Sequence, residues 1–153
     1  MENEKQSRAD ANDLVNAVVN YAKRMLVKYG EFGPIGFSLA PDRKINNETV
    51  ARKDMPADPS LLLDLLEQQL VERASKQEIV AAAAGANVSL DKPSAEGYSD
   101  AVLIEVEHQS GYCIKAFVPY KMGGGQMHNL LPRIVRFGKI RVQDGASRWF
   151  GQR

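Results

Sequence analysis

Cys113 and His108 are the residues whose types and spacing first suggest catalysis. The chain has one cysteine and two histidines, and a thiol held within about 3 Å of an imidazole can act as an activated nucleophile. The two residues lie on either side of a predicted turn formed by Gln109, Ser110 and Gly111. Whether they meet depends on the register of the strands that this turn connects.

The stretch from Ser99 to Tyr120 predicts a β-hairpin whose register is set by its own residues. Apolar and polar residues alternate on both sides of the turn, as they do in half-buried strands. A two-residue turn would place a lysine among the inward-facing aliphatic side chains. A three-residue loop with a left-handed Gly111 instead pairs apolar with apolar residues. The predicted pairs are Val106–Ile114, Ile104–Ala116, Val102–Val118, Glu105–Lys115 and Leu103–Phe117.

This register separates the thiol from the imidazole, because Cys113 and His108 fall on opposite faces of the sheet. We therefore predict an unreactive cysteine. Metal binding is not predicted, because His108 and His128 are separated by a strand and a glycine-rich stretch and no second cysteine is present. Gly123 to Gly125 lack the Gly-Lys-Ser/Thr ending of a phosphate-binding loop and are interpreted as a hinge. The sequence predicts no cofactor.

Carboxylates on the same hairpin are the remaining catalytic candidates. Glu105 and Glu107 are two apart on a strand, which places them about 6 to 7 Å from each other. Lys115 opposite Glu105 would keep that carboxylate ionised, and such alternation is typical of a solvated face. We predict that the protein is not an enzyme. An enzyme that uses Asp100, Glu105, Glu107 or His108 stays an alternative.

The C-terminal part of the chain carries the strongest functional signal. Residues 1–120 contain 13 Lys and Arg against 18 Asp and Glu, whereas residues 121–153 contain 7 against 1. Cations interleaved with aromatic residues suit backbone phosphates and stacked bases, and tryptophan is also enriched at protein interfaces. The alternative, which we favour, is that the aromatic residues dock on the acidic body and the arginines pair with it. The candidate binding residues are Arg133, Arg136, Lys139, Arg141, Arg148, Trp149 and Phe150.

Composition and hydropathy indicate one globular domain. The chain has 153 residues, of which 44% are hydrophobic and 25% charged, and a chain of this size can form a core without disulfides or metals. No apolar run is long enough to span a bilayer. The lone cysteine and the absence of a signal-peptide pattern favour a cytoplasmic location.

Periodicity predicts two helices. The first runs from Asp10 to Tyr29, with apolar residues at three- and four-residue spacings and Gly30 at its end. The second begins at Pro59 behind the cap Asp58 and carries a leucine stripe.

Between and after the helices, the pattern predicts strands at 35–39, 44–50 and 79–90, in addition to the hairpin. Small residues in the third of these would let a helix lie close to the sheet, and Gly85 in it suggests a bulge.

The predicted fold is α+β with the order α-β-β-α-β-β-β, an antiparallel five-stranded sheet with two helices packed on it. By analogy this order is similar to that of roadblock-type and profilin-like domains, which are mostly binding or scaffold modules. We divide the chain into a disordered N-terminus (1–9), the domain (10–122), and a glycine-rich linker with a basic tail (123–153). Lys139 to Gln143 in the tail suggest a short extra strand.

Two stretches, 29–44 and 98–121, resemble a group of small uncharacterised bacterial α+β proteins. The shared pattern is a helix closing on Gly-Glu-Phe, a Pro-Asp-Gly turn, a strand opening on Asp-Ala and a hairpin closing on Pro-Tyr. Arg43 occupies the position of the turn glycine. The resemblance implies no activity. The matching residues are Glu31, Phe32, Pro34, Asp100, Ala101, Pro119 and Tyr120.

From these observations we expect a non-enzymatic cytoplasmic bacterial protein that binds another protein or itself, as a homodimer. An immunity protein or a secretion chaperone would fit this description. The alternative is nucleic-acid binding through the basic, aromatic tail. No membrane role is expected.

Overall fold

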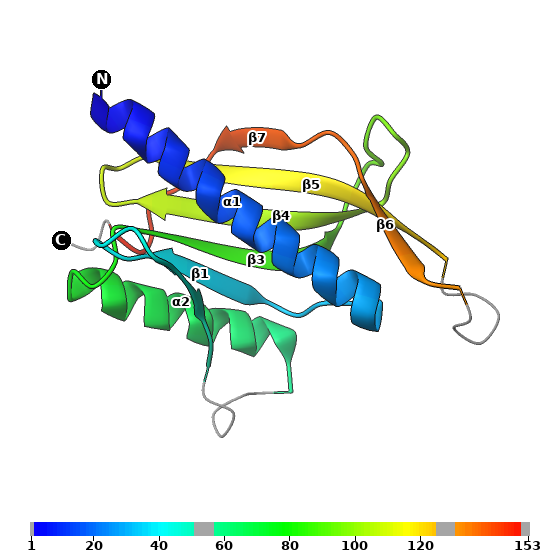
Figure 1. Cartoon of the computed structure of the whole chain (residues 1–153), viewed down its shortest axis with the longest axis horizontal. Coiled ribbons are helices and arrows are strands. Elements are labelled where there is room, and N and C mark those ends of the chain that lie inside the picture. Colours follow the sequence, from blue (N-terminus) through cyan, green and yellow to red (C-terminus); the bar gives the residue numbers. More distant parts are fainter. Residues whose placement is uncertain (1, 51–56, 125–130, 151–153) are drawn as a thin grey trace.

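An antiparallel sheet lies between two helices in the computed structural model, which describes residues 2–50, 57–124 and 131–150 (Figure 1). The α+β class and the packing of both helices on the sheet are as predicted. In chain order the elements are α1 (Glu2–Tyr29), β1 (Ile35–Leu39), β2 (Ile45–Glu48), α2 (Pro59–Ser75), β3 (Ala81–Ser89), β4 (Asp100–His108), β5 (Cys113–Gly124), β6 (Arg133–Phe137) and β7 (Arg141–Asp144).

The β4–β5 hairpin has the predicted register. Val106 lies opposite Ile114 and Glu105 lies opposite Lys115, and the other predicted pairs are present as well. Gly111 at the tip has a φ of 97°, which a glycine adopts without the steric cost that a side chain would bring. The hairpin therefore presents an aliphatic face toward α1 and a mixed face on the other side.

The sheet has seven strands within the described residues, two more than the five predicted. Their order is β2-β1-β3-β4-β5-β6, and β7 also pairs with β5. The predicted short strand at 139–143 corresponds to β7, whereas β6 is unexpected because its arginines mask the apolar alternation. Gly123 and Gly124 extend β5 rather than forming a hinge. Residues 125–130 of the predicted linker lie outside the described part of the chain.

β6 and β7 lie on the same edge of β5 and are offset from each other by one residue. Tyr120 pairs with Phe137 in β6, whereas Phe117 pairs with Arg141 in β7. Pro119 lies between these pairs and has no N–H to donate to a neighbouring strand. Its carbonyl accepts the Gly138 N–H at 2.7 Å. We interpret the interruption as a one-residue bulge in what is otherwise one long strand.

α1 crosses the strands on one face of the sheet (Figure 1). Leu14, Val18 and Leu26 on its inner side are almost fully buried against aliphatic residues of β1, β3, β4 and β5. Tyr29, the last residue of the predicted apolar stripe, is 57% exposed.

The helix begins at Glu2 rather than at Asp10, so residues 2–9 are helical and not a disordered N-terminus. The buried residues of this first part include Ser7 and Asp10. Because these buried residues are polar, no apolar periodicity marks the segment as helical.

Gly85 lies under α1 and does not form the predicted bulge. Its pairing with Ile35 and Ile104 continues without interruption. A Cβ at this position would lie 2.6 Å from Val18 Cγ1 and 3.2 Å from Ile35 Cγ1. The glycine therefore permits the close approach of α1 to the sheet that the small residues of β3 predict.

Gly85→Ala is expected to lower the free energy of unfolding by about 1 to 3 kcal/mol, because the added methyl overpacks the contact with α1. Denaturant unfolding followed by circular dichroism measures this. Gly33→Ala is the matched control, because a Cβ at Gly33 has nothing within 4 Å. An unchanged midpoint for Gly85→Ala would contradict the close packing.

α2 packs on the opposite face of the sheet, over β1 and β3. It begins at Pro59, and the Asp58 side chain accepts the Ser60 N–H at 2.9 Å, as predicted. Leu70 on its inner side packs against Ala82 and Ala84 of β3. α2 covers this part of the face, over β1 and β3.

Candidate functional site

Trp149 and Phe150, two of the predicted binding residues, dock on the α2 side of the sheet. Trp149 is 2% exposed and packs with Leu70 and Ile79. The Glu107 carboxylate, itself buried, accepts the backbone N–H of Trp149 at 2.9 Å and that of Phe150 at 3.2 Å. The segment is thus fixed by its main chain as well as by its indole.

Arg148 joins this docked segment to the acidic body. It forms ion pairs with Glu67 of α2 at 2.9 Å and with Glu105 of β4 at 2.5 Å. Burial raises the pKa of Glu67, although Arg148 and its hydrogen bond act in the opposite direction. For Arg148, Trp149 and Phe150, the favoured interpretation of intramolecular docking is confirmed. We call residues 147–150 the docked segment.

The other four candidate residues belong to β6, β7 and the bulge between them. Arg133 donates to the Lys28 carbonyl at 3.0 Å and so caps the C-terminus of α1. The Lys139 backbone N–H donates to Glu96 at 3.1 Å. Arg136 and Arg141 are exposed, and neither has an ion pair within the described ranges. The structure therefore divides the seven residues into a docked group, Arg133 at the end of α1, and an exposed group.

On the α2 side of the sheet, the surface of β5, β6 and β7 is exposed or half-buried within the described residues. Residues opposite each other in an antiparallel pair share a face, so the strand registers identify the members of this surface. Three are apolar, of which Ile134 is 51% exposed, and four are cations. We call this set the open face: Leu103, Lys115, Phe117, Lys121, Ile134, Arg136 and Arg141.

Cys113 and His108 lie on opposite faces of the sheet, as predicted. Cys113 is on the α2 side, opposite Glu107. Burial raises the pKa of the Cys113 thiol, and the Glu107 carboxylate raises it further. A thiol with a raised pKa is mostly protonated at neutral pH and is a weak nucleophile.

His108 belongs to a buried polar cluster that the sequence does not predict. Its Nε2 lies 2.9 Å from Asp10 Oδ2, and its Nδ1 accepts the Ser110 backbone N–H at 3.1 Å. Ser7 Oγ lies 3.4 Å from the same Nδ1. In space, His108 lies between Ser7 and Asp10, which is the arrangement of a Ser-His-Asp catalytic triad. However, the Ser110 amide already uses the Nδ1 lone pair that would take the serine proton.

Arg43 completes this cluster from the β1–β2 turn. Its guanidinium forms a two-point ion pair with the Asp10 carboxylate. Burial tends to raise the pKa of Asp10, but hydrogen bonds from Arg43, Gln6 and His108 outweigh it and hold the pKa below its ordinary value. Arg43 has a φ of 76°, a left-handed conformation that costs a side chain free energy. The ion pair offsets this cost.

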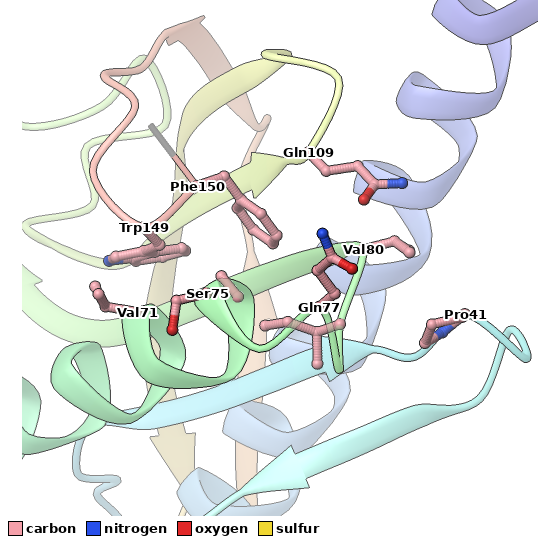
Figure 2. Close-up of a pocket in the computed structure, with 10 residues that line it drawn as sticks. Pro41, Val71, Ser75, Gln77, Val80, Gln109, Trp149 and Phe150 are labelled. Atoms are coloured by element: carbon pink, nitrogen blue, oxygen red, sulfur yellow. The ribbon is translucent and has the colours of Figure 1, made fainter. Parts of the chain in front are cut away.

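A pocket of about 630 Å³ opens beside the docked segment (Figure 2). Its ten lining residues come from the β1–β2 turn, the end of α2, the loop before β3, the β4–β5 loop and the docked segment, and none is charged. Figure 2 shows Gln77, Gln109 and Phe150 around the same opening. A pocket of this size is within the range of small-molecule sites.

Comparisons with known proteins found no matching family model, curated protein or solved structure. Across the described ranges, no group of three or more His, Cys, Asp and Glu side chains is arranged to hold a metal ion. Neither of the two helices in that part of the chain is long and apolar enough to cross a membrane.

Proposed function

We propose that the protein is a non-enzymatic protein-interaction module and that the open face is its binding surface. The observation that carries this proposal is a half-uncovered sheet face with an apolar centre and four cations that have no ion pair in the described residues. Analogy with roadblock-type and profilin-like domains, which bind or scaffold other proteins, agrees with this role.

The partner that fits is an amphipathic helix with acidic flanks. Neighbouring strands are about 4.8 Å apart, so β5, β6 and their neighbours offer a strip roughly one helix wide. α2 packs on β1 and β3 of the same face in this way through Leu70. Acidic flanks would complement Lys115, Lys121, Arg136 and Arg141. An immunity protein or a secretion chaperone would use such a surface in the same manner.

Exposed apolar residues support this location. Among the large hydrophobic side chains that are exposed within the described residues, Ile134 lies on the open face. It shares this face with the half-buried Leu103 and Phe117, and an apolar patch with a polar rim is typical of interaction sites. Nucleic-acid binding is disfavoured because Trp149, the best stacking side chain of the basic tail, is buried.

The test uses a blocked 18-residue helical peptide with a leucine stripe flanked by glutamates, and a second peptide with lysines in place of the glutamates. We expect the acidic peptide to bind in a fluorescence anisotropy titration. The variant Arg136→Glu/Arg141→Glu should weaken it about tenfold, because each lost ion pair changes to a repulsion. Lys5→Glu/Lys23→Glu makes the same charge change on exposed α1 positions and should have little effect.

Two outcomes would overturn this proposal, and a third would change the partner that it names. Equal binding of both peptides would remove the role of the cations. Binding of a 15-nucleotide oligothymidine with a steep salt dependence, without peptide binding, would favour the nucleic-acid alternative. A dimer in sedimentation equilibrium that the Arg136→Glu/Arg141→Glu variant dissociates would identify the partner as a second copy of the chain.

A further inference from the structure

We infer that the pocket beside the docked segment is a binding site for a small, uncharged molecule that carries a carboxamide on an apolar body. This site is separate from the open face, and the inference does not depend on the proposed function. Its evidence is the chemistry of the pocket wall and the position of two glutamines.

The wall of the pocket selects against charge. Ile79 and Trp149 at its base are almost fully buried, and Val71, Val80 and Phe150 are half-buried. A charged group that enters loses its hydration and finds no opposite charge on the wall, which costs free energy. An uncharged aromatic or aliphatic group loses little hydration and gains contact with these side chains. The body of the ligand is therefore apolar.

Two carboxamides define the polar part of the ligand. Gln77 and Gln109 are exposed at the opening, and neither side chain has a hydrogen-bond partner among the described residues. A carboxamide offers both donors and an acceptor, so a pair of them can bind a ligand amide, which needs both. A few convergent polar groups over an apolar cavity are typical of small-molecule sites.

The backbone of Gln77 ends α2 at the opening of the pocket. It has a φ of 59°, a left-handed conformation that is strained for a glutamine. Its N–H donates to the Ala74 carbonyl at 3.0 Å, which closes the end of α2. The Glu78 N–H donates to the Arg73 carbonyl at 3.0 Å, so Gln77 is the left-handed residue with which helices commonly end. A glycine at this position would relieve the strain.

The probe that tests the site is N-acetylphenylalaninamide, an uncharged aromatic amide. Trp149 is the single tryptophan of the chain and lies in the pocket wall, so its fluorescence reports on occupancy directly. We expect a saturable change with half-saturation at about a millimolar or below. N-acetylphenylalanine, which is anionic, and phenylalaninamide at pH 6, which is cationic, should bind at least about tenfold more weakly.

Variants connect the signal to the pocket without disturbing the fold. Ala74→Leu fills the pocket from α2 and should abolish the change. Gln77→Gly removes one carboxamide, should weaken binding several-fold, and should not destabilise the protein because it relieves the left-handed strain. Gln77→Asn keeps the carboxamide in a residue that tolerates this conformation and should retain more of the binding.

The inference fails if the fluorescence does not saturate with the uncharged probe, or if the anionic analogue binds as tightly. It also fails if Ala74→Leu leaves the titration unchanged, because the probe would then bind elsewhere. Tenfold tighter binding of a blocked Ala-Phe-Ala peptide than of the amide would overturn the small-molecule assignment in favour of a peptide site. None of these results would alter the predictions for the open face.

Discussion

Trp149→Ala is expected to lower the free energy of unfolding by about 3 to 5 kcal/mol, the usual cost of deleting a buried tryptophan. The indole fills the space between Leu70, Ile79 and the alanines of β3, so its removal leaves a cavity. The substitution also removes the side-chain contacts that attach the docked segment to the sheet. Guanidinium unfolding followed by circular dichroism measures the loss.

Trp149→Phe is the matched control. The Trp149 Nε1 is buried and has no hydrogen-bond partner in the described ranges, and such an unsatisfied donor costs about 1 to 3 kcal/mol. Phenylalanine removes this donor and retains much of the contact area, so its effect should be far smaller. A Trp149→Ala variant that unfolds at the same denaturant concentration as the unaltered protein would contradict the docking of this segment.

Asp10→Asn is expected to lower the free energy of unfolding by about 2 to 3 kcal/mol at pH 7, because hydrogen bonds to a charged group are worth about 1.5 to 3 kcal/mol. The carboxylate accepts from Arg43, Gln6 and His108, and the asparagine retains part of this set. Asp13→Asn, an exposed position on the same helix, is the control and should change little.

The pH dependence of this difference separates the charge from the shape of Asp10. The folded pKa lies below the ordinary value of 3.8, so the folded state binds fewer protons here than the unfolded state. The stabilisation is therefore complete above about pH 4 and is lost as the pH falls through the lower folded value. The gap between the two proteins should close as the pH falls from 5 toward 2. A gap that persists at pH 2 would show that packing, not charge, is responsible.

The parts of the fold that the sequence predicts well are those decided by neighbouring residues. The β4–β5 register follows from alternation on two strands joined by three residues, and the start of α2 follows from Asp58 and Pro59. Both signals lie within one element or one turn. The same alternation places Cys113 and His108 on opposite faces, which removes the most obvious catalytic pair before any coordinates are known.

The buried polar cluster could not be predicted in this way. Asp10 and His108 are 98 positions apart, and Ser7 and Asp10 interrupt the apolar pattern by which helices are recognised. For Glu107 the sequence prediction is wrong. The alternation of apolar and polar residues in β4 predicts that Glu107 faces solvent, but the docked segment buries it. A charge on the polar face of a strand does not reveal which distant segment will cover it. Within this cluster, only Arg43 is unusual in the sequence itself, because the turn pattern that the chain resembles has a glycine there.

The offset between β6 and β7 at Pro119 has a consequence for fibril growth. A continuous exposed edge strand is a template on which further copies of a chain can polymerise. Here the ladder of hydrogen-bonding groups on β6 is out of step with that on β7, and each strand is short. An incoming strand that matches one half cannot match the other. The one-residue bulge opposite Pro119 thus makes this edge a poor template for amyloid-like stacking.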